Sequence, residues 1–97
     1  MKKILVVDDR KDIRDFLKFN LQKEGYKTAK ASDGLKALET AESQKPDLIL
    51  LDIMLPHKDG FEVLRELCKN TTTASTSVIF LTTKKIKKRS KQLTSAL

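Results

Sequence analysis

The sequence has few of the residues that are typical of exported proteins, of proteins stabilised by a bound metal, or of membrane-spanning proteins. Its 97 residues include one cysteine, two prolines, three glycines and no tryptophan. Cys68 cannot form a disulfide within the chain and has no companion ligands at zinc-site spacing, so we expect it to act as a small apolar residue. No apolar run approaches the roughly 18 residues of a membrane span. The N-terminus begins with basic residues, as a signal peptide does, but its apolar stretch stops after residue 7. Export is therefore not expected, and a cytoplasmic location is favoured.

The positive charge is concentrated at the C-terminus. The formal net charge is +7, and residues 84–97 hold six of those charges with no acid. They come from Lys84, Lys85, Lys87, Lys88, Arg89 and Lys91. We therefore predict one folded domain over residues 1–83, and a basic tail over residues 84–97 that could form a helix. The tail has no aromatic residue for base stacking, so a solvated tail is favoured over nucleic-acid binding.

Apolar runs predict four strands with helices between them. Residues 4–7, 48–51 and 78–81 are continuous apolar runs, typical of strands buried on both faces, and residues 27–31 alternate weakly. Helical spacing predicts three amphipathic helices between these strands. The first has an apolar stripe of Ile13, Phe16, Leu17 and Leu21, with Arg14, Asp15 and Lys18 expected to face solvent. Alternating strands and helices predict an α/β fold with a doubly wound parallel sheet.

Acids and a hydroxyl follow three of these strands. Asp8 and Asp9 follow the first, Asp52 follows the third and Thr82 follows the fourth. The carboxyl ends of parallel strands meet at one edge, where open sheets bind ligands, so three carboxylates should converge there. Crowded carboxylates repel one another unless a cation relieves them, and Mg²⁺ prefers such oxygen ligands.

This arrangement indicates phosphoryl chemistry, with Asp52 as the best-placed nucleophile for an acyl phosphate. Each residue has an ordinary alternative. The Asp8–Asp9 pair could mark a strand end or cap a helix, Asp52 could belong to a turn, and Thr82 could be a β-branched strand residue. Their joint placement on one edge favours the site.

Four stretches of the chain resemble the receiver domain of bacterial two-component response regulators. They are ILVVDD at residues 4–9, PDLILLD at 46–52, LPHKDGFE at 55–62 and VIFLT at 78–82. The resemblance covers residues 2 to about 83, and the order and spacing of the stretches make it specific. It implies a flavodoxin-like fold of βα repeats.

The resemblance also implies a role for each site residue. Asp52 would accept a phosphoryl group from a sensor histidine kinase. Asp8, Asp9 and Asp52 would hold Mg²⁺ together with the backbone carbonyl of Met54. Thr82 would be the switch hydroxyl, and Pro56 and Gly60 would shape the loop beside the site.

The chain departs from the family after the fourth strand. Receiver domains have a fifth strand that ends in a lysine, and the sequence has no match to that strand or to the last helix. We therefore assign no residue to that lysine. The fourth strand would then be an exposed edge, through which two copies could pair or exchange elements to form a homodimer.

Three functions remain as alternatives. The first is a phosphoacceptor signalling module, which is not an enzyme in the ordinary sense and is not expected to bind nucleic acid without an effector domain. The second is a truncated receiver-fold interaction fragment with impaired switching. The third is a magnesium-dependent phosphoryl-transfer enzyme, but such enzymes place a second acid two residues after the first, where this chain has Arg10.

Overall fold

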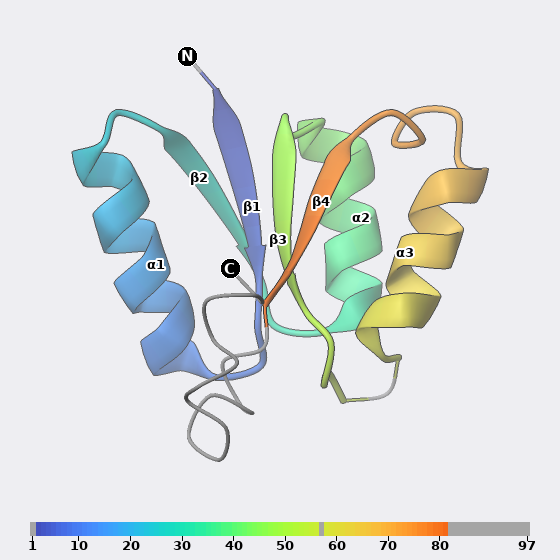
Figure 1. Cartoon of the computed structure of the whole chain (residues 1–97), viewed down its shortest axis with the longest axis horizontal. Coiled ribbons are helices and arrows are strands. Elements are labelled where there is room, and N and C mark those ends of the chain that lie inside the picture. The colour runs from blue at the N-terminus through green and yellow to red at the C-terminus, as the bar shows by residue number, and fades with distance from the viewer. Residues whose placement is uncertain (1, 57, 82–97) are drawn as a thin grey trace.

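The described part of the chain folds into one sheet with three helices around it. A computed structural model describes residues 2–56 and 58–81. The elements follow the order β1 (Lys3–Val7), α1 (Lys11–Lys23), β2 (Lys27–Ala31), α2 (Gly34–Gln44), β3 (Leu48–Asp52), α3 (Gly60–Lys69) and β4 (Ser77–Leu81) (Figure 1). This is the strand and helix alternation that the apolar runs predict.

The four strands are parallel, in the order β2-β1-β3-β4. β1 and β3 are therefore the central strands, and Val7 lies opposite Leu51 across them. The order reverses between β1 and β3, where successive connections leave toward opposite faces. The sequence prediction of a doubly wound parallel sheet is confirmed, and the described residues contain the four strands expected and end with β4.

The main core lies between the sheet and the pair α2 and α3. Alternate residues of the central strands point into it, since side chains in a strand face opposite sides in turn. The buried cluster combines strand residues with one face of each helix: Leu5, Val7, Ala31, Ile49 and Leu51 with Ala37, Ala41, Val63 and Leu67. Small residues on α2 let that helix approach the sheet closely.

The α1 side of the sheet is covered more thinly. Ile4 and Val6 alternate with the residues of the main core and are also buried. No residue of α1 itself is buried, and Phe16 keeps 64% of its surface exposed. The prediction that Phe16 belongs to the buried stripe is therefore wrong. α1 contacts β1 and β2, and the partial burial of Ile13, Leu17 and Leu21 is sufficient for this contact.

Aspartate side chains cap the N-termini of α2 and α3. The Asp33 carboxylate accepts from the Lys36 N–H at the start of α2, and the Asp59 carboxylate accepts from the Glu62 N–H at the start of α3, both at 2.9 Å. Gly25, with φ of +94°, supplies the left-handed turn between α1 and β2. These caps fix where the connecting loops leave the helices.

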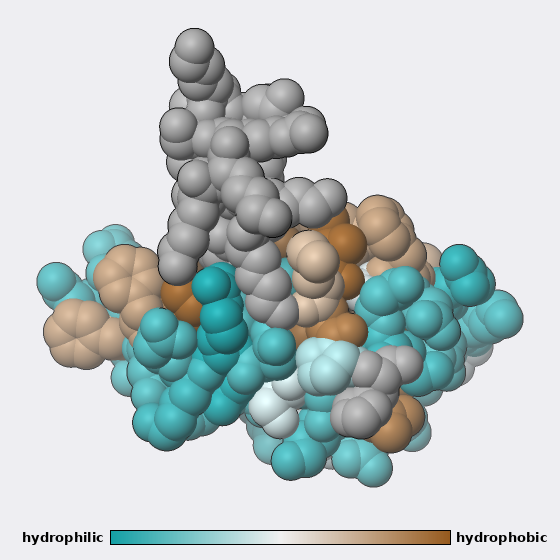
Figure 2. Space-filling view, turned by 90° about the horizontal axis from the view of Figure 1, so that it is seen from below, coloured by the Kyte–Doolittle hydropathy of each residue, from teal (hydrophilic) through white to brown (hydrophobic). Residues whose placement is uncertain are grey.

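The face at the carboxyl ends of the strands is mostly hydrophilic, with smaller apolar areas near its middle and at its edges (Figure 2). Met54 and Phe61 keep about half of their surfaces exposed, at 50% and 53%. In residues 2–56 and 58–81, no helix combines the length and the apolar content that crossing a membrane requires.

Candidate functional site

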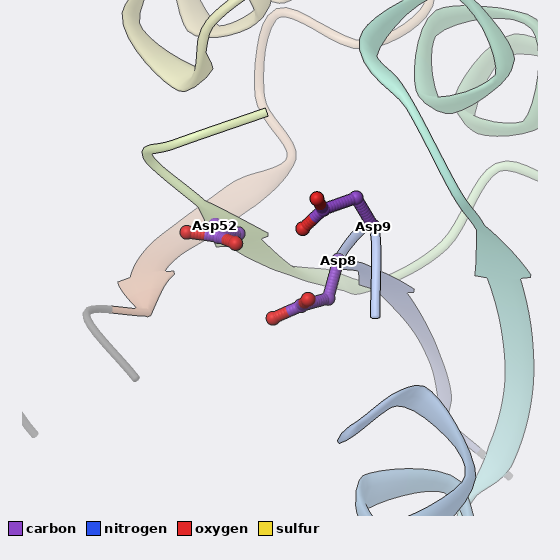
Figure 3. Close-up of side chains that lie close together, drawn as sticks. All are labelled: Asp8, Asp9 and Asp52. Carbon is purple, nitrogen blue, oxygen red and sulfur yellow. The ribbon is translucent and has the colours of Figure 1, made fainter. Parts of the chain in front are cut away.

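Three carboxylates converge at the carboxyl ends of the central strands. β1 ends at Val7, and Asp8 and Asp9 follow at once; Asp52 is the last residue of β3. One carboxylate oxygen from each of the three lies within 4.8 Å of the others. Figure 3 shows the Asp8 and Asp9 side chains reaching toward the side on which Asp52 lies. The convergence follows from the parallel register, because neighbouring strands end at the same level.

Asp8 is a fully buried carboxyl in a like-charged neighbourhood. Its Oδ1 accepts the backbone N–H of Arg10 at 2.9 Å, and its own N–H donates to the Ala31 carbonyl of β2. Burial raises the pKa of the Asp8 carboxyl above its usual value of 3.8. The hydrogen bond from Arg10 opposes this rise in pKa, and the charge of Asp52 adds to it. An ionised Asp8 therefore needs positive charge nearby.

Asp52 is almost as deeply buried, with 1% of its surface exposed. Its Oδ1 accepts the Met54 N–H at 3.0 Å, which holds the carboxylate against the first turn of the loop after β3. Asp9 is exposed. The cluster thus has two carboxylates set in the protein and a third on its open side, from which an ion or a phosphoryl donor can approach.

The loop between β3 and α3 is held against the end of β3 at Gly60. The Gly60 N–H donates to the Ile53 carbonyl at 2.9 Å. A Cβ at Gly60 would lie 2.8 Å from the Asp52 carbonyl oxygen and 2.8 Å from Ile53 Cα. Only glycine allows this approach, so α3 begins in direct backbone contact with Asp52.

The same loop is fixed at a second point by Lys58. The Lys58 ammonium bonds to the Glu66 carboxylate on α3, and this partner raises the pKa of Lys58 above 10.5. The Lys58 backbone packs on the start of α2, where a Cβ at Gly34 would lie 2.8 Å from the Lys58 carbonyl oxygen. The loop is therefore held between α2, α3 and the end of β3.

The structure describes all but one of the site residues predicted from the sequence. Asp8, Asp9 and Asp52 lie together, Met54 lies two residues beyond Asp52, and Pro56 and Gly60 belong to the adjoining loop. In that loop, the Pro56 carbonyl accepts the Lys58 N–H at 2.7 Å. Thr82 lies outside the described residues, as does the basic tail.

Two arginines at the site are missed by the sequence analysis. Arg14 is not turned fully to solvent as predicted, because its Nη1 donates to the Asp8 backbone carbonyl at 2.8 Å. Arg10 Nε lies 3.6 Å from Asp8 Oδ1. Their positions in the sequence could have indicated this: Arg14 lies one helical turn after Arg10, on the first turn of α1, which faces the Asp8–Asp9 segment.

The donor set suits a hard divalent cation. All three side chains offer carboxylate oxygens, two of them are buried, and burial together with the charge of Asp52 raises the pKa of Asp8. Mg²⁺ favours oxygen ligands and is commonly held by one or two carboxylates together with water and phosphate oxygens. The residues present therefore fit a magnesium site.

The fold and the acidic edge together define a receiver domain. The response regulator receiver domain family matches residues 4–96, so the chain belongs to that family. Phosphorylation on an aspartate and magnesium binding are typical of the family. The resemblance inferred from the four sequence stretches is confirmed.

Individual relatives agree with this assignment. The chain is 56% identical over 66 residues to the alkaline phosphatase synthesis transcriptional regulatory protein PhoP of Bacillus subtilis (strain 168), a match that covers 68% of this chain and 28% of that protein. This chain thus spans little more than a quarter of that relative.

Solved structures share the fold. The N-terminal domain of a response regulator receiver protein from Methanoculleus marisnigri JR1 matches with a TM-score of 0.80 and 33% identity, over 93% of this chain and 77% of that one. The receiver domain of a sensor histidine kinase from Pseudomonas aeruginosa PAO1 matches with a TM-score of 0.81 and 28% identity, over 99% and 79% of the two chains. That structure has a magnesium ion coordinated in its active site cleft.

Proposed function

We propose that this chain is a phosphoacceptor signalling module of a two-component system, which receives a phosphoryl group on Asp52 from a sensor histidine kinase in a magnesium-dependent step. The observation that carries the proposal is the cluster of Asp8, Asp9 and Asp52, whose carboxylate oxygens lie within 4.8 Å of one another. Membership of the receiver family supports the reaction, and the magnesium-bound relative supports the cofactor. The proposed location is the cytoplasm.

In the proposed reaction, an Asp52 carboxylate oxygen attacks the phosphorus of a phosphohistidine. The new O–P bond forms while the N–P bond breaks, and the imidazole leaves with a proton taken from water. The Met54 N–H on Asp52 Oδ1 holds the carboxylate in place, and we assign the attack to its other oxygen. Asp8, Asp9, Asp52 and the Met54 carbonyl are the proposed magnesium ligands, and an ion held there would neutralise charge on the transferred group.

Thr82 is the proposed switch hydroxyl, which would hydrogen-bond the phosphoryl group after transfer. Pro56 and Gly60 are proposed to keep the loop beside Asp52 in one conformation. The contacts of Gly60 with the Asp52 backbone support this role for the loop. The product is a changed charge at the sheet edge, read by a partner, so we propose a signalling module and not a turnover enzyme.

The test is phosphoryl uptake by the whole chain, measured as intact mass after incubation with acetyl phosphate or a phosphorylated histidine kinase. We expect one added phosphoryl group in the presence of Mg²⁺ and none with EDTA or in Asp52→Asn. Asp47→Asn is the matched control, because Asp47 is exposed at the other end of β3, where it accepts the Lys3 N–H. Uptake by Asp52→Asn equal to that of the wild type would refute the assignment.

We also propose that β4 pairs with β4 of a second copy to form a homodimer. Among the described residues, β4 pairs on one side alone, with β3. The opposite edge strand, β2, carries Lys27 and Lys30, which discourage edge pairing, whereas β4 (Ser77–Leu81) has no charge. Its Ile79 keeps 44% of its surface exposed.

Sedimentation velocity over a range of protein concentrations tests the dimer. We expect Ile79→Lys to shift the chain to monomer, and Leu35→Lys, which changes a leucine on α2 that is 58% exposed, to leave the association unchanged. Rapid exchange between labelled copies would indicate edge pairing, and exchange only on unfolding would indicate that elements are swapped. A monomer at every concentration would contradict both.

A further inference from the structure

Arg10 places a permanent positive charge beside the carboxylate cluster. It directly follows Asp8 and Asp9 and is the N-cap residue of α1, with φ of −94° and ψ of 120°. This extended backbone lets its N–H reach back to Asp8 Oδ1 at 2.9 Å, and its Nε lies 3.6 Å from the same oxygen. The side chain is only 29% exposed, so the guanidinium is directed toward the site and not into bulk water.

A guanidinium relieves the repulsion among these carboxylates without neutralising any of them, as a bound proton would. It stays protonated at every physiological pH, and its charge is fixed close to Asp8, which is itself fully buried. Inside a partly buried site, this attraction is screened less than at the surface. The same charge necessarily repels any second cation that approaches the cluster.

We propose that Arg10 is a built-in electrostatic competitor of magnesium, which stabilises the metal-free cluster and weakens magnesium binding to Asp8, Asp9 and Asp52. This rests on the proposed function, because it takes the three carboxylates as the magnesium site. Metal occupancy is then set by a balance between two cations that share one carboxylate, and it responds to the magnesium concentration instead of being constant. Arg10 acts by positioning charge and is not a ligand or a catalytic group.

The first measurement is the magnesium affinity of the whole chain in low salt, which amide-resolved NMR monitors. Arg10→Gln removes the charge while keeping a side chain of intermediate length, and we expect its magnesium affinity to rise about 5-fold or more, the scale of a typical coupling between two sites. Arg10→Lys keeps the charge, so its affinity should stay closer to that of the wild type.

Lys11→Gln is the matched control. It removes the same charge one residue along the chain, but the Lys11 ammonium bonds to Asp15 at 2.8 Å and its side chain is 80% exposed. A general change in net charge would act equally in both variants, whereas the proposal predicts a change of less than about 2-fold for Lys11→Gln because exposed charges are screened by solvent and salt.

The second measurement is the shift of the urea unfolding midpoint on adding saturating magnesium. It should be larger for Arg10→Gln than for the wild type or for Lys11→Gln, because the variant's metal-free cluster lacks its compensating cation. Equal affinities for Arg10→Gln and the wild type, with binding intact, would overturn the inference and leave the magnesium site standing. Equal gains in Arg10→Gln and Lys11→Gln would also overturn it. If no variant bound magnesium, the metal-dependent step of the proposed function would be refuted together with the inference.

Discussion

The contact between Gly60 and the end of β3 makes Gly60→Ala a stringent test of how the site is built. The added methyl group would lie 2.8 Å from the Asp52 carbonyl oxygen and from Ile53 Cα, and 3.3 Å from the Asp52 carbonyl carbon. These are backbone atoms of a central strand and the residue after it, so they cannot rotate away as a flexible side chain would. Either α3 or the end of β3 must move.

The expected loss of stability follows from two opposing effects. Alanine is favoured over glycine in a helix by about 0.5–1 kcal/mol, and Gly60 is the first residue of α3. Overpacking a tight contact costs about 1–3 kcal/mol. The net expectation is a loss of about 1–2 kcal/mol in the free energy of unfolding, accompanied by a displaced Asp52.

Urea unfolding followed by magnesium titration separates the two consequences. Gly25→Ala is the control: no atom lies within 4 Å of the new Cβ, but φ of +94° disfavours alanine by about 1–2 kcal/mol. We expect both variants to lose stability and only Gly60→Ala to lose magnesium affinity. A Gly60→Ala protein as stable as the wild type, with unchanged affinity, would refute the close-contact argument.

Three further predictions follow from individual contacts. Asp8→Asn should raise the urea midpoint at pH 7 and abolish magnesium binding. Burial raises the pKa of Asp8 in the folded state, so the charge of Asp8 destabilises the fold above that pKa. The gain in urea midpoint from Asp8→Asn should therefore shrink as pH falls toward 3.8. A variant midpoint below that of the wild type at pH 7 would contradict this. Lys58→Gln and Glu66→Gln should each destabilise the chain by the same amount as the double variant, because one contact is lost in all three. The raised pKa of Lys58 means that this contribution is present below pH 10.5 and disappears as pH rises through the folded-state pKa, which a pH series of midpoints checks. Asp59→Ala should cost about 1 kcal/mol, since its carboxylate caps the Glu62 N–H, and an unchanged midpoint would count against the cap.

Much of the fold is legible in the sequence because strands buried on both faces leave a strong pattern. The runs at residues 4–7 and 48–51 contain no polar residue to interrupt them, and both end at acids. Parallel register then brings the ends of β1 and β3 to the same edge, so the meeting of Asp8, Asp9 and Asp52 needs no detailed knowledge of packing.

What the sequence could not show depends on side-chain conformation and on contacts between separate loops. Arg14 belongs to a polar position of the α1 pattern, and only its conformation brings Nη1 to the Asp8 carbonyl. The approach of Gly34, the first residue of α2, to the Lys58 backbone joins a helix and a loop that are 24 positions apart, and no periodicity indicates such a contact. The prediction fails at Phe16 because the helical period identifies the apolar side of α1 but not how much of that side the sheet buries.

The positions of the carboxylates also explain why charge, and not movement, controls this site. Asp8 follows Val7, and Asp52 follows Leu51; both apolar residues are fully buried in the main core. The two acids therefore cannot separate unless the central strands shift, which would open a close-packed interior. Besides the backbone N–H groups that Asp8 and Asp52 accept, protonation, a cation of the chain such as Arg10, or a bound metal ion can relieve their repulsion. Under the proposed function, a phosphoryl group on Asp52 would change that same balance of charge, and the loops around the rigid sheet edge would be the parts able to respond.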